Sequence, residues 1–172
     1  MKKVSIALAL CCVLCIVAGA FALQVGAKVW NIQLRDSSDN PAYIPDLGTK
    51  VVMITYADST AADQNDALAT AVKNKAYPEA VYRGQGVANL ADSKWIPDSA
   101  IRAMVRKKEA QFNTTILTDG DRSLPTQWGL GNVDDISVVI LIAKDLTVKY
   151  INYGPVTDID GVIRMIDEEI AK

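Results

Sequence analysis

The strongest constraint on the fold is an apolar segment in the C-terminal part of the chain, ISVVILIA, at residues 136–143. Short uncharged segments rich in β-branched residues are typical of strands buried on both faces of a sheet. Asp145 and Leu146 then make a tight turn into TVKYINYG, so the two strands are expected to form an antiparallel hairpin. A similar segment, KVVMITYA at residues 50–57, predicts a second buried strand.

Helical patterns alternate with these strands. The segment STAADQNDALATAVKNK has Leu68 and Val72 four residues apart and offers Ser59 or Thr60 as a cap, so it predicts a helix directly after the strand. A second helix is predicted from Pro97, a residue suited to a first helical turn. Its apolar side chains recur at helical spacing and are Ile101, Met104, Val105 and Phe112.

The last helix has the clearest pattern. Thr157 and Asp160 have capping-box spacing, with Asp in place of the usual Glu or Gln. One apolar stripe follows, made of Ile159, Val162, Ile163, Ile166 and Ile170.

The remaining segments complete the order of elements. The sequence from residue 27 to 48 reads as a strand or hairpin arm that leads into a turn. Residues 76–95 contain Gly84 and Gly86 and lack clear periodicity, so they are expected to be irregular apart from a short strand at 80–82. TTILTDGDRSLPTQWGLG predicts a short strand and one helical turn before Gly129. Together these elements predict an α/β fold, a central mixed sheet covered by helices.

The first residues predict a secretory signal peptide. Two lysines precede an uncharged apolar stretch that ends in the A-x-A pattern of a signal peptidase site at residues 20–22. Residues 1–22 are therefore expected to be removed, which leaves one domain at residues 23–172 in the periplasm or outside the cell. The alternative is that the stretch, which continues to residue 27, stays as a membrane anchor, because about 20 apolar residues can span a bilayer.

Composition excludes several kinds of chemistry. All three cysteines, Cys11, Cys12 and Cys15, lie in the segment expected to be removed, and the chain has no histidine. The mature chain therefore lacks a disulfide, a thiolate nucleophile, a Cys or His zinc site and a histidine-based triad. Without Lys2 and Lys3, 16 basic residues remain against 20 acidic ones, a formal charge of −4, so nucleic acid and anionic membranes are poor partners. No cofactor is expected, although carboxylates could hold a hard cation such as calcium.

Most of the mature chain resembles the thioredoxin fold. KVVMITYADSTAADQNDALATAV is similar to the first strand–helix unit of that fold, and SVVILIAKDLTVKYINYG to its final hairpin. TTILTDGDRSLPTQWGLG is similar to the matching strand and turn of peroxiredoxin-type and TlpA-type proteins. The secreted character, the inserted central helix, the C-terminal segment DDISVVILIAKDLTVKYINYGPVTDIDGVIRMIDEEI and the lack of a redox motif most resemble the YtfJ family of periplasmic thioredoxin-like proteins. The resemblance implies a thioredoxin-like domain.

The sequence departs from this fold at its chemical centre. Where a thioredoxin has Cys-x-x-Cys and a peroxiredoxin has Thr-x-x-Cys, this chain has TAAD at residues 60–63. A carboxylate can neither exchange disulfides nor be oxidised to a sulfenate, so thiol–disulfide oxidoreductase and peroxidase activities are not expected. Ahead of the hairpin, where such proteins place a cis-proline, the chain has DDI at residues 134–136.

The residues at this replaced site are the candidates for ligand binding. They lie where a central strand ends and a helix begins, a position at which α/β sheets bind ligands and helix amides favour anions. The alternative is plain capping, with Ser59 or Thr60 as N-cap and Asp63 against the helix dipole. The candidates are Tyr56, Asp58, Thr60, Asp63 and Asp135.

Other motifs have simpler interpretations. Asp119, Gly120 and Asp121 are expected to form the turn after a strand. The three tryptophans are expected to pack in the core or at its rim, with Trp95 the best candidate for an exposed anchor. A basic group is expected to form the solvated side of a helix and consists of Arg102, Arg106, Lys107 and Lys108.

Two functions from different classes fit the sequence. The first is a non-redox binding or interaction module in the periplasm, which holds a protein, peptide or small ligand at residues 56–63 and 84–95. The second is a hydrolytic or cation-assisted enzyme built on Asp58, Asp63, Asp134 and Asp135. The enzyme requires these carboxylates to converge in one pocket. Neither function involves nucleic acid or, after signal cleavage, a membrane.

Overall fold

The computed structural model describes residues 22–93 and 95–172. The three cysteines and most of the predicted signal peptide lie outside the described residues. No helix among the described residues combines the length and the apolar character needed to cross a membrane. In chain order, the elements are β1 (Gln33–Arg35), β2 (Pro41–Tyr43), β3 (Val51–Ala57), α1 (Asp66–Lys75), β4 (Tyr82–Asn89), α2 (Asp98–Phe112), β5 (Ile116–Asp119), α3 (Ser123–Trp128), β6 (Val138–Ile142), β7 (Val148–Tyr153) and α4 (Ile159–Ile170).

All seven strands form one mixed sheet in the order β2-β1-β5-β4-β3-β6-β7. β3, β4 and β5 run parallel to one another, whereas β6 pairs antiparallel with both β3 and β7. The predicted mixed sheet, the hairpin of β6 and β7 and the closing helix are therefore confirmed. β3 and β6 lie side by side at the centre, so the segment that follows β3 meets the segment that precedes β6.

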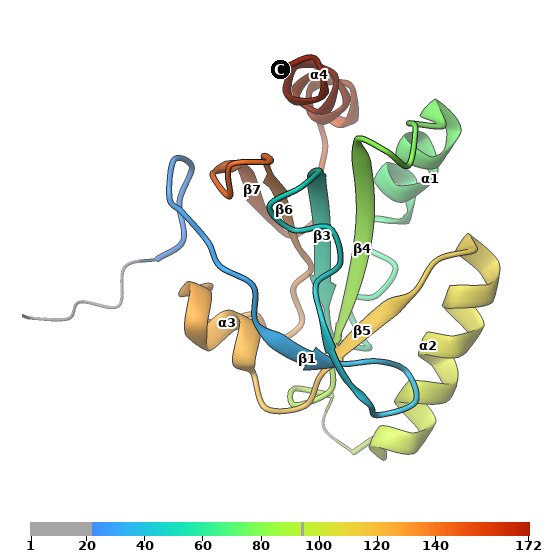
Figure 1. Ribbon diagram of the computed structural model, residues 1–172. Helices are drawn as coiled ribbons and strands as arrows, with labels where there is room; N and C mark the ends of the chain where they lie inside the picture. Colours follow the sequence, from blue (N-terminus) through green and yellow to red (C-terminus); the bar gives the residue numbers. More distant parts are fainter. Residues whose placement is uncertain (1–21, 94) are drawn as a thin grey trace, which may run out of the picture.

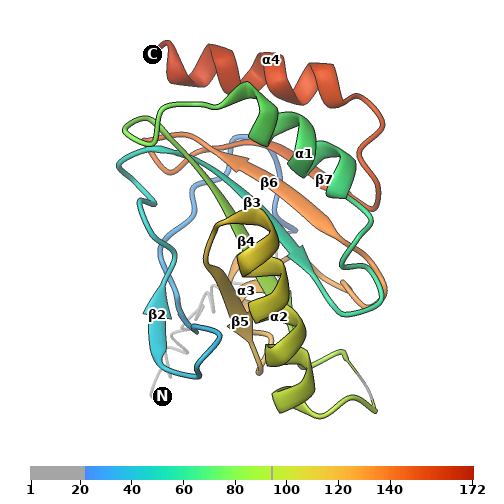
Figure 2. The ribbon, with the colours of Figure 1, turned by 90° about the vertical axis from the view of Figure 1, so that its right-hand side faces the viewer.

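The helices divide between the two faces of the sheet. Figure 1 shows α3 on the opposite side of the sheet from α1 and α2, and Figure 2 shows α1, α2 and α4 together on one side. Side chains of β3 alternate between the faces as a strand requires: Val52 and Ile54 pack in the core on the α3 side, whereas Val51 and Met53 pack with α1 and α4. Both central strands are thus buried on both faces, as their apolar sequences predict.

β4 corrects one prediction. The segment expected to be irregular contains an eight-residue strand that pairs with both β3 and β5. Its fully buried residues on one face are Gln85, Val87 and Asn89, so two of the three are polar and the apolar alternation is absent. A Cβ at Gly86 would lie 3.2 Å from Ile116 Cγ1, so the neighbouring strand leaves little room for a side chain there.

Two helix caps also differ from the predictions. α1 begins at Asp66 rather than directly after β3, and Ser59 and Thr60 lie in the turns that precede it. In α4 the cap is Asp158, whose carboxylate accepts a hydrogen bond from the Gly161 amide, and not Thr157. In α4 several neighbouring side chains are able to cap and the backbone path selects Asp158, whereas the N-cap residue of α1, Asn65, makes no side-chain cap hydrogen bond.

α2 begins at Asp98, with Pro97 at its N-cap position. Ile101 and Val105 are buried in a small core cluster, as expected, whereas Met104 is exposed. The apolar stripe of this helix is therefore narrower than the sequence predicts.

Candidate functional site

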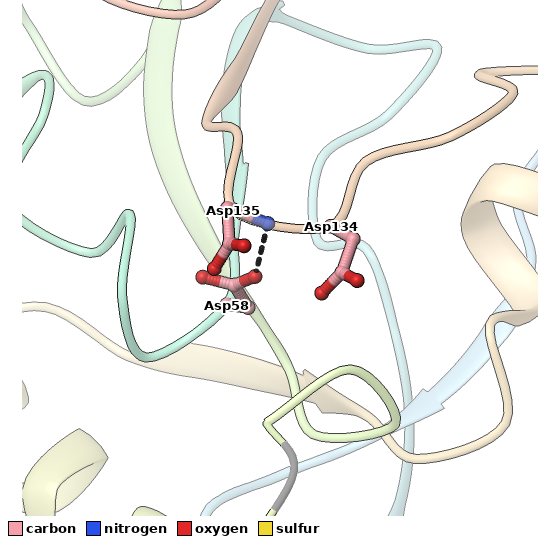
Figure 3. A group of neighbouring side chains, drawn as sticks. All are labelled: Asp58, Asp134 and Asp135. Carbon is pink, nitrogen blue, oxygen red and sulfur yellow. Dashed lines mark hydrogen bonds between the residues drawn. The ribbon is translucent and has the colours of Figure 1, made fainter.

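Three loops meet where β3 and β4 end and β6 begins. They consist of residues 58–65 after β3, residues 90–93 and 95–97 after β4, and residues 134–136 before β6. The amide of Ser59 donates a hydrogen bond to the Ser93 hydroxyl at 3.2 Å, which ties the first loop to the second. The Asp135 amide donates to Asp58 Oδ2 at 2.7 Å, which ties the first to the third (Figure 3). We call the outer surface of these loops, formed by residues 59–60, 62–63, 95–96 and 134–136, the strand-end surface.

Asp58 holds these loops together. Its side chain is only 2% exposed, and its Oδ1 accepts hydrogen bonds from the Thr60 amide, the Thr60 hydroxyl and the Ala61 amide at 2.8 to 2.9 Å. Burial opposes ionisation, but these bonds and the one from the Asp135 amide outweigh it and hold the pKa of Asp58 below its ordinary value. Asp58 therefore acts as an ionised acceptor that fixes the loop.

Two further carboxylates lie beside Asp58. Figure 3 shows Asp134 and Asp135 next to it, and one carboxylate oxygen from each of the three lies within 4.8 Å of the others. The Thr60 hydroxyl also contacts Asp135 Oδ1 at 2.6 Å. A cluster of this kind has the donor type of a hard-cation site. However, Asp58 Oδ1 already accepts three hydrogen bonds, so the free capacity of Asp58 lies on Oδ2.

Asp63 is not part of this cluster. Its carboxylate forms an ion pair at 2.6 Å with Lys108 of α2. Lys108 also donates to the Ala62 carbonyl at 2.9 Å and to Asp66 at 3.2 Å. Of the four carboxylates that the enzyme hypothesis requires, three lie together and the fourth joins the loop to α2.

Lys108 belongs to the basic group expected to be solvated, and two other members of this group also make contacts within the chain. Arg102 bonds to Thr118 and Asp39, both at 2.6 Å, and Arg106 donates to the Ser37 carbonyl at 3.0 Å. Arg106 and Lys107 are exposed, as expected for the solvated side of a helix, whereas Arg102 and Lys108 are partly buried and attach α2 to segments distant in the sequence.

Tyr56 also lies away from the strand-end surface. Its side chain is fully buried on the α3 side, and its hydroxyl donates to Asp119 Oδ2 at 3.3 Å. Burial and the neighbouring Asp119 raise the pKa of this phenol well above its ordinary value. Its role in this position is therefore that of a neutral core residue.

Asp119 has a larger structural role than a turn residue. Only 1% exposed, it accepts hydrogen bonds from the amides of Ser123 and Leu124 at 2.9 and 3.0 Å and so satisfies the first turn of α3. Burial raises the pKa of Asp119, although these amide bonds act in the opposite direction. Sequence patterns of helix caps place the acceptor two or three residues before the amide, so they do not indicate Asp119.

The tryptophans differ in their exposure. Trp128 is buried, and its indole nitrogen donates to the Trp30 carbonyl at 3.1 Å, whereas Trp30 itself is half exposed. Trp95 is 100% exposed, next to the partly exposed Ile96. The expectation that Trp95 is an exposed side chain is confirmed.

Comparison with known proteins identifies the family and the fold. Residues 44–169 match the family described as "Bacterial protein of unknown function (YtfJ_HI0045)". Among curated proteins, none matches the chain.

Solved structures similar to this one are thioredoxin-like. A candidate thiol:disulfide interchange protein, DsbE, from Chlorobium tepidum has a TM-score of 0.65 and 17% identity over 87% of this chain and 99% of its own. An uncharacterized conserved protein from Geobacillus kaustophilus has a TM-score of 0.66 and 11% identity over 87% and 83%. A thiol peroxidase from Chromobacterium violaceum has a TM-score of 0.60 and 13% identity over 86% and 88%. At these identities, the likeness shows the fold alone.

Proposed function

The chain belongs to the YtfJ family of bacterial proteins of unknown function, and from this premise we propose that it is an exported, non-redox binding module. Its ligand is a protein or peptide held at the strand-end surface. The observation that carries the proposal is Trp95, a fully exposed indole beside loops that are fixed by buried hydrogen bonds.

The absence of a thiolate nucleophile favours binding over redox catalysis. The thiols on which thioredoxins and peroxiredoxins depend are missing from residues 60–63, and the chain has no cysteine beyond Cys15. Disulfide exchange and peroxide reduction both need a thiolate nucleophile. A thioredoxin scaffold without this group retains only its shape and surface, which are the properties that binding uses.

Buried hydrogen bonds fix the loops of the strand-end surface. Ser59 and Ala61 donate to the buried Ser93 and Asp58 side chains, and the Asp135 amide donates to Asp58 as well. Loops fixed in this way lose little conformational entropy when a partner binds. The strand-end surface is therefore preorganised for binding.

Trp95 supplies the exposed apolar side chain of this surface. A large apolar side chain in full contact with water contributes nothing to the core, yet it offers more area to a partner than any other residue type. Tryptophan is enriched among the residues that dominate binding energy at protein interfaces. Trp95 also has a φ of 74°, a left-handed backbone that is an outlier for a bulky residue, and such strain is concentrated at ligand-binding sites.

The test is affinity capture with chemical crosslinking, using residues 23–172 as bait in an extract of the native periplasm. Two variants alter the strand-end surface, Thr60→Arg and Trp95→Ala. A matched control, Ala80→Arg, alters an exposed residue ahead of β4, at the opposite end of the parallel strands. All three variants are first checked for unchanged thermal unfolding.

The proposal predicts one protein or peptide that the unmodified bait and Ala80→Arg both recover and that both strand-end variants lose. Equal recovery by all four baits contradicts it. So does recovery of nothing by the unmodified bait under conditions where crosslinking of a known complex succeeds.

A further inference from the structure

The side chain of Leu23, at the start of the described chain, is packed into the domain. Leu23 is 8% exposed and belongs to the core cluster on the α3 side of the sheet, whereas Ala22 is exposed. The backbone nitrogen of Leu23 donates to the Gly129 carbonyl at 3.0 Å. Leu23 is thus the first residue of the described chain that is anchored in the core, although residues 24–26 after it are exposed.

The residues after Leu23 are held along the start of β7. The Gly26 amide donates to the Val148 carbonyl at 2.8 Å, and the Val148 amide donates back to the Ala27 carbonyl at 2.9 Å. The Val29 amide adds a third bond, to the Leu146 carbonyl at 3.0 Å. A cut within this segment would remove core and backbone contacts, whereas a cut just before Leu23 removes none of them.

The sequence places an A-x-A cleavage pattern at residues 20–22, immediately before Leu23. We propose that a signal peptidase hydrolyses the Ala22–Leu23 peptide bond and that the new terminus remains docked in the domain. Water supplies the hydroxyl that completes the Ala22 carboxyl group and the hydrogen that passes to the Leu23 nitrogen. The carboxyl group then loses its proton, and the amino group of Leu23 takes one up and becomes an α-ammonium.

The new ammonium meets a favourable partner. Gly129 is the C-cap of α3, where the last carbonyls of a helix have no intrahelical partner and carry partial negative charge. A cation at a helix C-terminus is stabilising, and the nitrogen of Leu23 already points at the Gly129 carbonyl. Processing therefore converts a neutral amide contact into a charge-assisted one at the same position.

The first experiment measures the intact mass and the N-terminal sequence of the full chain after expression in a bacterium. We expect a product that starts at Leu23, and an unprocessed precursor for Ala22→Glu, which places a charged side chain before the cut. A retained N-terminus, or a start at any other residue, overturns the proposal. This result is independent of the binding proposal, because no partner takes part.

The second experiment tests the docking of the processed terminus. Leu23→Ala removes the buried side chain and leaves the A-x-A pattern intact, and Gln24→Ala alters the exposed neighbour as a control. We expect Leu23→Ala to lower the unfolding midpoint by several degrees and to speed digestion by an aminopeptidase, with no change for Gln24→Ala. Equal midpoints and equal digestion rates for the two variants overturn the docking.

Discussion

Asp58 offers the sharpest test of how the strand-end surface is held. Asp58→Ala removes the acceptor of four hydrogen bonds, made by the Thr60 amide and hydroxyl, the Ala61 amide and the Asp135 amide. Thr60 and Asp135 are exposed, so water can take the place of the carboxylate at their amides. Ala61 is fully buried, and its amide would lose its partner, which costs about 1–3 kcal/mol. With a smaller loss at the exposed donors, the free energy of unfolding is expected to fall by about 2–4 kcal/mol.

Asp58→Asn is the matched variant of nearly equal size. Its carbonyl oxygen can still accept from Thr60 and Ala61, but its NH₂ group then faces the Asp135 amide, donor against donor. We expect a loss of about 1–2 kcal/mol, smaller than for alanine.

The lowered pKa of Asp58 predicts how the stability difference between the unmodified protein and Asp58→Asn changes with pH. The pKa of Asp58 is below its ordinary value in the folded protein, because its hydrogen bonds outweigh the effect of burial. A lowered pKa contributes stability that is present above the unfolded-state pKa of about 3.9 and is lost as the pH falls through the folded-state pKa. The stability gap between the unmodified protein and Asp58→Asn should therefore narrow as the pH falls below about 4.

Urea unfolding followed by circular dichroism, at neutral and at acidic pH, measures both effects. The reasoning is refuted if Asp58→Ala unfolds within about 0.5 kcal/mol of the unmodified protein, the range typical of surface substitutions. A gap that widens on acidification refutes it as well.

Three other substitution pairs test contacts elsewhere in the domain by the same unfolding assay. Among the described residues the buried Tyr82 hydroxyl has no hydrogen-bond partner, so Tyr82→Phe should stabilise the protein by up to about 1 kcal/mol. Tyr77→Phe loses a 2.7 Å bond to Asp167 and should destabilise it by a similar amount. Destabilisation by Tyr82→Phe would contradict this assignment. Asp158→Ala removes the α4 cap and should lower the free energy of unfolding by about 1 kcal/mol, whereas Thr157→Ala should leave it almost unchanged. A larger loss for Thr157→Ala than for Asp158→Ala would show that Thr157 is the cap. Lys108→Ala breaks the contacts with Asp63, Asp66 and the Ala62 carbonyl, so it should destabilise the protein by about 1 kcal/mol, and by less at high salt. Lys107 is exposed, and Lys107→Ala serves as the control. Equal effects of the two substitutions would refute a stabilising role for the Lys108 contacts.

The sequence predicts the elements whose patterns are strong. β6 and β3 are continuous apolar segments, and α4 buries the apolar stripe that its spacing indicates, with Val162 and Ile166 fully buried. β4 was missed because the side chains of Gln85 and Asn89 point into the core, so the strand lacks the apolar alternation on which the prediction relies.

Only part of the candidate site was predicted from the sequence. Neighbouring strands bring the loops after β3 and before β6 together, so the contact of Asp58 with Asp135 follows from the fold that the sequence resembles. Tyr56 was predicted at the site because it lies close to Asp58 in the sequence, but its side chain is buried in the core on the α3 side of the sheet. The ion pair of Asp63 with Lys108 joins residues 45 positions apart, and no local pattern contains such a contact.

Site-specific photocrosslinking in the living bacterium tests the central claim, that the strand-end surface binds a partner, most directly. A photoreactive amino acid replaces Trp95 in one version of the exported chain and Ala80 in another. The account predicts a discrete crosslinked partner at position 95 that is absent at position 80. Adducts of equal yield at both positions, or none at position 95, would contradict it.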